Sequence, residues 1–106
     1  MFKVVDRPEF THDVPIMVPV DGGHDEQILK TRFRLISNER WEELGVVSAT
    51  DILDEIVVSF EDLVDASKAP LPCDPVVRTT LLGMPHVRIG LITYYRVATQ
   101  KARLGN

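Results

Sequence analysis

The sequence has one cysteine, Cys73, and no apolar run that approaches the roughly 20 residues needed to cross a bilayer. A single cysteine excludes an internal disulfide and supplies too little sulfur for a structural zinc site. The opening stretch, MFKVVDRPEF, carries four charges and lacks both a secretory apolar core and a small-residue cleavage site. We therefore expect a cytoplasmic protein that does not enter a membrane.

A catalytic constellation is also missing from the sequence. Cys73 stands beside Asp74 and has no base close to it in the sequence. A free thiol is therefore favoured over a nucleophile, although folding could still bring a base such as His86 to it. The three histidines are far apart and have no paired metal-ligand spacing; they are His12, His24 and His86. We expect no enzymatic activity, no metal and no cofactor.

The glycine-containing stretch 21–25 is typical of a turn. Asp21, His24 and Asp25 could chelate a metal there, but a solvated loop is the favoured interpretation. Gly22-Gly23 lacks the sequence context of a phosphate-binding loop, so a positive φ for the turn is the favoured role of these glycines.

The length of 106 residues fits one domain, residues 1–106, with a β-hairpin region at 1–36 and a helical region at 37–106. The net charge of −4 hides a split along the chain. Residues 39–65 carry nine acids against Arg40 alone, and residues 66–106 carry six cations against Asp74 alone. The charges could be matched between copies of the chain. We favour the alternative that they are solvated or neutralised within one fold.

The first third of the chain has the period of two that is typical of strands. Four β-branched residues of the stretch 14–20 alternate with Pro15, Met17 and Pro19, and the prolines either place this strand at a sheet edge or leave one side of it unpaired. In the stretch 29–35, an apolar face alternates with a cationic face formed by Lys30, Arg32 and Arg34. The two runs predict an antiparallel hairpin around a loop of about five residues, and residues 2–5 are a candidate for a short third strand.

From residue 37 onward the pattern becomes helical. Ser37 or Asn38 can cap a short helix that ends at Gly45, and Ser48-Ala-Thr-Asp51 has the form of a capping box. The helix that begins there is expected to continue through Phe60 and Val64. On such a helix Glu61 and Asp62 would lie about 100° apart, as a solvated surface and not a catalytic pair.

Two further helices are predicted, over residues 75–82 and from Pro85 to the end of the chain. The fold class is therefore α+β, with an N-terminal antiparallel β-hairpin, extended to three short strands if residues 2–5 join it, followed by a small bundle of about four helices. The cationic strand face and the basic final helix are the candidates for binding nucleic acid. The net charge of −4 and the acidic middle segment would repel phosphates, so we do not expect nucleic acid as a partner.

The order of these features resembles a known family. A valine- and proline-rich edge strand and a Gly-rich turn precede KTRFRLI, which runs into the capped helix SNERWEEL. The phrase FEDLVD at 60–65 and a proline-containing loop precede Leu81-Leu82, Pro85-His86-Val87, Tyr94-Tyr95 and a closing Gly105-Asn106. Over residues 10–106 this resembles the tail assembly chaperones of long, flexible-tailed (siphovirus-like) bacteriophages or prophages. The chain departs from that pattern by Phe for Trp at position 60 and by two extra prolines in the first strand.

The resemblance implies a protein that holds the tape measure protein soluble and extended and helps recruit tail tube subunits. It implies self-association, action in the host bacterial cytoplasm and absence from the mature virion. Two alternatives stay open: a structural head–tail joining or tail completion protein, and a small DNA-binding regulator.

Two sets of residues are candidates for binding a partner. The edge strand contributes Val14, Ile16 and Val18. The middle and last helices contribute an apolar set made of Ile52, Ile56, Phe60 and Tyr95. The competing interpretation is that these residues form the core of the domain, and we favour it for Ile52, Ile56 and Phe60.

Overall fold

The computed structural model describes residues 1–45 and 48–104, with side chains described up to residue 100. The chain forms a three-stranded antiparallel sheet in the order β1-β2-β3 and four helices, which confirms the α+β class and the N-terminal hairpin. The closing Gly105-Asn106 of the family pattern lies outside the described residues.

The hairpin is longer, and its turn tighter, than the sequence predicted. Strand β1 (Glu9–Val20) pairs with β2 (Gly23–Arg34) along their whole lengths, and only Asp21 and Gly22 form the turn. Gly22 has a φ of 80°, a conformation that a residue without a Cβ adopts at little cost. The predicted five-residue loop was wrong because residues 23–25 continue the ladder.

The prolines of β1 lie on its open edge, as predicted. The N–H of Leu35 donates to the carbonyl oxygen of Pro8 at 2.9 Å, in register with the ladder. Backbone groups in an antiparallel pair alternate between the partner strand and the opposite side, so even-numbered β1 residues bond to β2. The backbone nitrogens of Pro15 and Pro19 therefore face the open edge. Their lack of an N–H costs no hydrogen bond between β1 and β2.

The third strand is not where the sequence predicted it. Residues 1–8 form no strand, whereas β3 (Val57–Glu61) pairs with β2 through Thr31↔Phe60 and Arg32↔Ser59. Helix α2 (Ala49–Ile56) therefore ends eight residues before Val64, the end that the sequence predicts. The residues at its end, Ile-Val-Val, are β-branched and favour an extended backbone. The second edge of β2 provides backbone hydrogen-bond partners that only an extended segment can reach.

This change also overturns the helical interpretation of Glu61 and Asp62. Glu61 ends β3 and accepts a hydrogen bond from the Thr11 hydroxyl at 3.4 Å. Asp62 follows with a φ of 54° and forms an ion pair with Lys30 at 3.5 Å. The two acids thus tie the end of β3 to β1 and β2, and they do not lie on a helix.

Local hydrogen bonds begin the three short helices at the predicted residues. The side chains of Ser37, Ser48 and Asp74 each accept from a backbone N–H in the first turn of the helix that follows. The helices are α1 (Asn38–Leu44), followed by Gly45, then α2, then α3 (Pro75–Leu82), followed by Gly83, and α4 (Pro85–Leu104).

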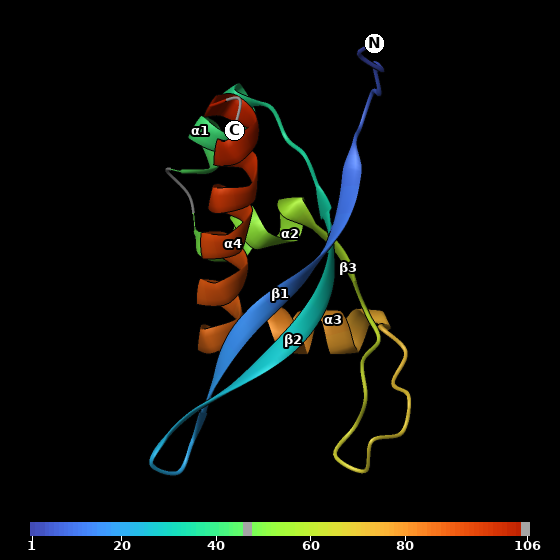
Figure 1. The fold of residues 1–106 in the computed structure, drawn as a ribbon, viewed down its shortest axis with the longest axis vertical. Coiled ribbons are helices and arrows are strands. Elements are labelled where there is room, and N and C mark those ends of the chain that lie inside the picture. Colours follow the sequence, from blue (N-terminus) through green and yellow to red (C-terminus); the bar gives the residue numbers. More distant parts are fainter. Residues whose placement is uncertain (46–47, 105–106) are drawn as a thin grey trace.

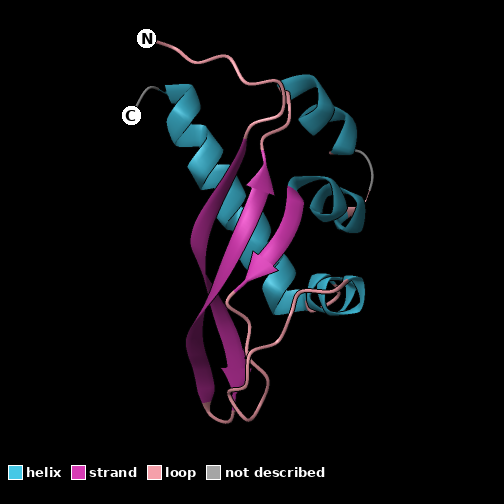
Figure 2. Cartoon of the chain, turned by 90° about the vertical axis from the view of Figure 1, so that its right-hand side faces the viewer, coloured by secondary structure: helices cyan, strands magenta, loops and turns pink. Residues whose placement is uncertain are grey.

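The core lies between one face of the sheet and the helices, and α4 runs along the hairpin (Figure 1). In Figure 2 the sheet forms one layer with α4 behind it. Buried side chains from the sheet meet those of α2 and α4; the fully buried ones include Val14, Phe33, Leu53, Ile56 and Leu91. Gly90 permits close packing, because a Cβ there would lie 2.5 Å from Cδ1 of Ile16. In the described part of the chain, no helix is long and apolar enough to cross a membrane.

Candidate functional site

An apolar trough of about 740 Å³ lies between β1 and α4 on the outside of the fold. Three of its side chains are largely exposed: Met17 (51 %), Ile89 (69 %) and Val97 (49 %). The lining comes from two segments that are far apart in the sequence, with one residue from β2; it comprises Pro15, Met17, Pro19, His24, Pro85, His86, Ile89, Gly90, Thr93, Tyr94 and Val97. We call the surface formed by these residues the trough.

Simple periodicity places these side chains together. On β1, Pro15, Met17 and Pro19 alternate with the buried residues and therefore point to the opposite face. On α4, Pro85, Ile89, Thr93 and Val97 recur every four residues and form a second stripe beside the buried one at Val87, Leu91 and Tyr95. The trough forms where these two outward faces meet.

The hairpin beyond the trough is acidic. Residues 13–29 contain four acids and no lysine or arginine; the acids are Asp13, Asp21, Asp25 and Glu26. Because β1 and β2 extend to the turn at Asp21 and Gly22, three of these acids lie at or near the tip of the hairpin (Figure 1). An apolar trough that leads to an acidic tip suits a partner that is both apolar and cationic.

Most of the predicted partner-binding residues lie in the core. Val14 (0 %), Ile16 (3 %), Ile56 (0 %), Phe60 (3 %) and Tyr95 (2 %) are buried, and Val18 and Ile52 are partly buried against the same cluster. The side chains that are buried in this fold are not accessible to a partner, which agrees with the competing interpretation that they form the core. Their role in partner binding stays an untested prediction.

The exposed trough residues are absent from the predicted set, although the sequence carries a signal for them. Pro15, Met17 and Pro19 alternate with the β-branched residues of β1. By themselves they indicate only that the prolines keep this edge of the strand from pairing. The four-residue spacing of Ile89, Thr93 and Val97 is hidden by the stronger stripe at Val87, Leu91 and Tyr95. Neither pattern shows by itself that the two faces meet, because that depends on where α4 crosses the hairpin.

The residues considered for chemistry do not gather into a cluster. Cys73 is partly buried, and its Sγ accepts from the N–H of Phe60 at 3.5 Å. His24 and His86 both line the trough, whereas Nδ1 of His12 lies 3.0 Å from the hydroxyl oxygen of Tyr94. Among the described residues, no group of three or more His, Cys, Asp or Glu side chains is arranged to hold a metal ion.

The cationic face of β2 is matched by groups of the same chain. Arg32 pairs with Glu9 at 2.8 Å, Lys30 pairs with Asp62, and Arg34 donates to the backbone oxygen of Glu55 at 3.0 Å. Four acids of residues 39–65 also form ion pairs within the chain; they are Glu43, Asp54, Glu55 and Asp62. Among these pairs, the one between Arg78 and Asp54 joins the acidic segment 39–65 to the basic segment 66–106, so a part of the charge split is neutralised inside one fold.

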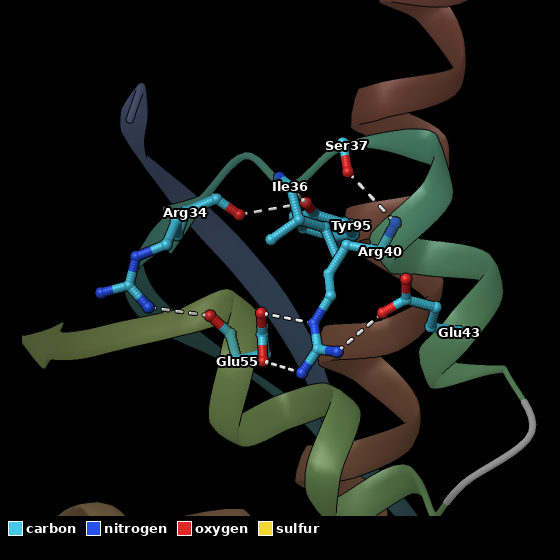
Figure 3. A network of polar contacts seen from close by, with 7 residues as sticks. All are labelled: Arg34, Ile36, Ser37, Arg40, Glu43, Glu55 and Tyr95. Atoms are coloured by element: carbon cyan, nitrogen blue, oxygen red, sulfur yellow. Dashed lines mark hydrogen bonds and ion pairs between the residues drawn. The ribbon is translucent and has the colours of Figure 1, made fainter. Parts of the chain in front are cut away.

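A polar network joins α1 to α2 (Figure 3). Nε and Nη2 of Arg40 donate to the two carboxylate oxygens of Glu55 at 2.8 and 2.9 Å, and Nη1 donates to Glu43 at 2.9 Å. Beside it, the Tyr95 hydroxyl donates to the backbone oxygen of Arg34 at 3.0 Å and accepts from the N–H of Ile36 at 3.3 Å. The hydrogen bonds from Arg40 lower the pKa of Glu55, and the same carboxylate raises the pKa of Arg40.

We expect Glu55→Gln to lower the melting temperature at pH 7 by at most a few degrees, because the pair lies at the surface, with side chains that are 45 % and 31 % exposed. A carboxylate whose pKa is lowered by folding stabilises the fold above its unfolded pKa of about 4.3, and this contribution is lost as the pH falls through the folded pKa. The difference from the unsubstituted protein should therefore be smaller at pH 2 than at pH 7. Thermal unfolding at both pH values measures it, with Glu42→Gln on the exposed side of α1 as the control. An equal decrease at both pH values would contradict the assignment.

Comparison of the chain with family models, with curated proteins and with solved structures gave no match.

Proposed function

We propose that this protein is a tail assembly chaperone of a siphovirus-like bacteriophage or prophage. It binds the tape measure protein, keeps it soluble and helps recruit tail tube subunits. It acts in the host bacterial cytoplasm as a homo-oligomer and is left out of the mature virion. The support is the sequence resemblance over residues 10–106 together with one structural observation, the exposed apolar trough between β1 and α4.

The trough has the character that this role requires. Tape measure proteins are long and mostly helical, so a protein that holds them must offer a shallow apolar surface bordered by charge. Ile89 and Met17 present apolar side chains that the domain leaves in water, and the acidic hairpin tip lies at the end of the trough. An apolar stripe of a client helix would bury these side chains. Several chaperone copies bound along one client would combine weak individual contacts into a high overall affinity.

Co-expression with the tape measure protein encoded in the same genome tests this proposal. The unsubstituted protein should raise the soluble fraction of the tape measure protein several-fold. Ile89→Asp should abolish the increase, because it places a charge where the client must bury an apolar side chain. Val76→Asp is the matched control, since Val76 is equally exposed (73 %) but lies on α3, outside the trough.

Two outcomes would count against the proposal. One is that co-expression leaves the soluble fraction of the tape measure protein unchanged. The other is that Ile89→Asp raises this fraction as much as the unsubstituted protein does. Mass spectrometry of purified phage particles separates the chaperone from a structural tail component, because the chaperone should be absent from them. Stoichiometric incorporation into particles would favour a head–tail joining or completion protein instead.

A further inference from the structure

Residues 1–8 form an arm that leaves the body of the protein at the end opposite the hairpin tip (Figure 1). The arm makes no strand, and its apolar side chains are in water: Phe2 is 91 % exposed and Val4 is 86 % exposed. It also carries Lys3 and Arg7 against a single acid, Asp6. The arm is thus a short irregular segment, apolar and net cationic, whose side chains at Phe2 and Val4 are not covered by the part of the chain that the structure describes.

The trough has the complementary properties. It is apolar, it is exposed, and it leads to a hairpin end that holds Asp21, Asp25 and Glu26 without a lysine or arginine between residues 13 and 29. We propose that the trough of one copy receives the arm of a second copy, with Phe2 and Val4 against Met17 and Ile89. Lys3 and Arg7 would then lie toward the acidic side of the hairpin.

The chain length favours a second copy over the protein's own arm. The arm joins β1 at Glu9, and Phe2 lies seven residues away, at most about 25 Å in a fully extended chain. Asp21 is twelve residues from Glu9 in the other direction, roughly 40 Å along the strand. An arm that folded back would reach the upper part of its own trough but not the acidic tip. The apolar and charged contacts can therefore be made together only between copies.

The arm and the trough are different surfaces, and they lie toward opposite ends of a molecule that measures 45 by 28 by 26 Å. Two antiparallel copies can exchange arms reciprocally into a closed dimer, and copies that make one such contact on each side join head to tail into open chains or rings. The arm would share the trough with the client of the proposed function and compete with it. The inference itself needs no client, and its test uses the pure protein.

Analytical ultracentrifugation over a range of protein concentrations tests the arm exchange. The unsubstituted 12.0 kDa chain should form dimers or larger species as its concentration rises. Phe2→Asp combined with Val4→Asp removes the arm contact, and Ile89→Asp or Met17→Asp removes the trough contact, so each variant alone should stay monomeric. Val76→Asp should assemble like the unsubstituted protein.

Mixing the variants gives the decisive result. An arm variant keeps a working trough and a trough variant keeps a working arm, so an equimolar mixture should form two-chain complexes and nothing larger. Formation of these complexes also shows that both variants are folded. The proposal is overturned if the unsubstituted protein is monomeric at every concentration, if the single variants assemble as it does, if Val76→Asp is equally monomeric, or if the mixture stays monomeric.

The same variants keep this inference separate from the proposed function. The arm variant retains an intact trough and should still raise the soluble fraction of the tape measure protein. Failure of arm exchange therefore leaves the client proposal standing, and failure of client binding leaves arm exchange standing.

Discussion

Phe33→Ala should lower the free energy of unfolding by about 3–5 kcal/mol, the usual cost of truncating a buried phenylalanine. Phe33 is fully buried on β2, and its ring lies 5.4 Å from those of Phe10 and Tyr95 and 6.5 Å from that of Tyr94. Alanine would leave a cavity where the hairpin packs on α4, and these rings cannot fill it without leaving their own contacts. Because small domains are stable by only about 5–15 kcal/mol, this single change should remove a large part of the stability.

Urea unfolding followed by circular dichroism measures this effect. Ile28→Ala is the control on the same strand, because Ile28 is 60 % exposed and its truncation should change the free energy by no more than about 0.5 kcal/mol. If both variants lost similar small amounts, the hairpin would not pack on α4 through Phe33, and the position of the trough would be wrong as well.

Arg78→Met should lower the free energy of unfolding by about 2 kcal/mol, the second largest effect that we expect. The guanidinium of Arg78, on α3, donates to the backbone oxygen of Val57 at 2.7 Å and to that of Asp54 at 3.1 Å. It also pairs with the Asp54 carboxylate at 2.9 Å, and its side chain is only 22 % exposed. Methionine keeps the aliphatic stem but leaves carbonyl oxygens at the end of α2 without this donor, and it removes a cation from the negative end of that helix.

Two comparisons locate the source of the loss. Asp54→Asn removes only the exposed ion pair and should cost less than about 1 kcal/mol. Arg88→Met removes a hydrogen bond to the exposed hydroxyl of Thr50 and should cost about 0.5 kcal/mol or less. If Asp54→Asn were as damaging as Arg78→Met, the ion pair and not the bonds to the backbone would hold this junction together.

The junction that Arg78 holds is also where the sequence-based prediction failed. The apolar residues Ile52, Ile56 and Phe60 fit a helix at a spacing of four, whereas the β-branched residues Val57 and Val58 favour a strand. Local preference does not decide between these states for a run of five residues. The open second edge of β2 decides it, because β3 gains a ladder there, and Arg78 stabilises the turn from helix to strand from a residue more than twenty positions away.

Local interactions explain what the sequence alone determined. The helix starts depend on Ser37, Ser48 and Asp74, whose side chains bond to backbone groups three residues ahead, and the hairpin depends on alternation and a glycine with positive φ. These features need only a few neighbouring residues, so they can be read directly from the chain.

Only the tertiary structure decided which apolar residues are buried and which are exposed. Val14 and Met17 belong to one strand, and Val87 and Ile89 to one helix, yet the first of each pair is in the core and the second lines the trough. Each element has two faces that carry apolar residues, and the sequence does not say which face meets a neighbour. Which face of each element is buried depends on where α4 crosses β1, near Gly90. This contact joins residues about seventy positions apart in the sequence, and its energy comes from packing.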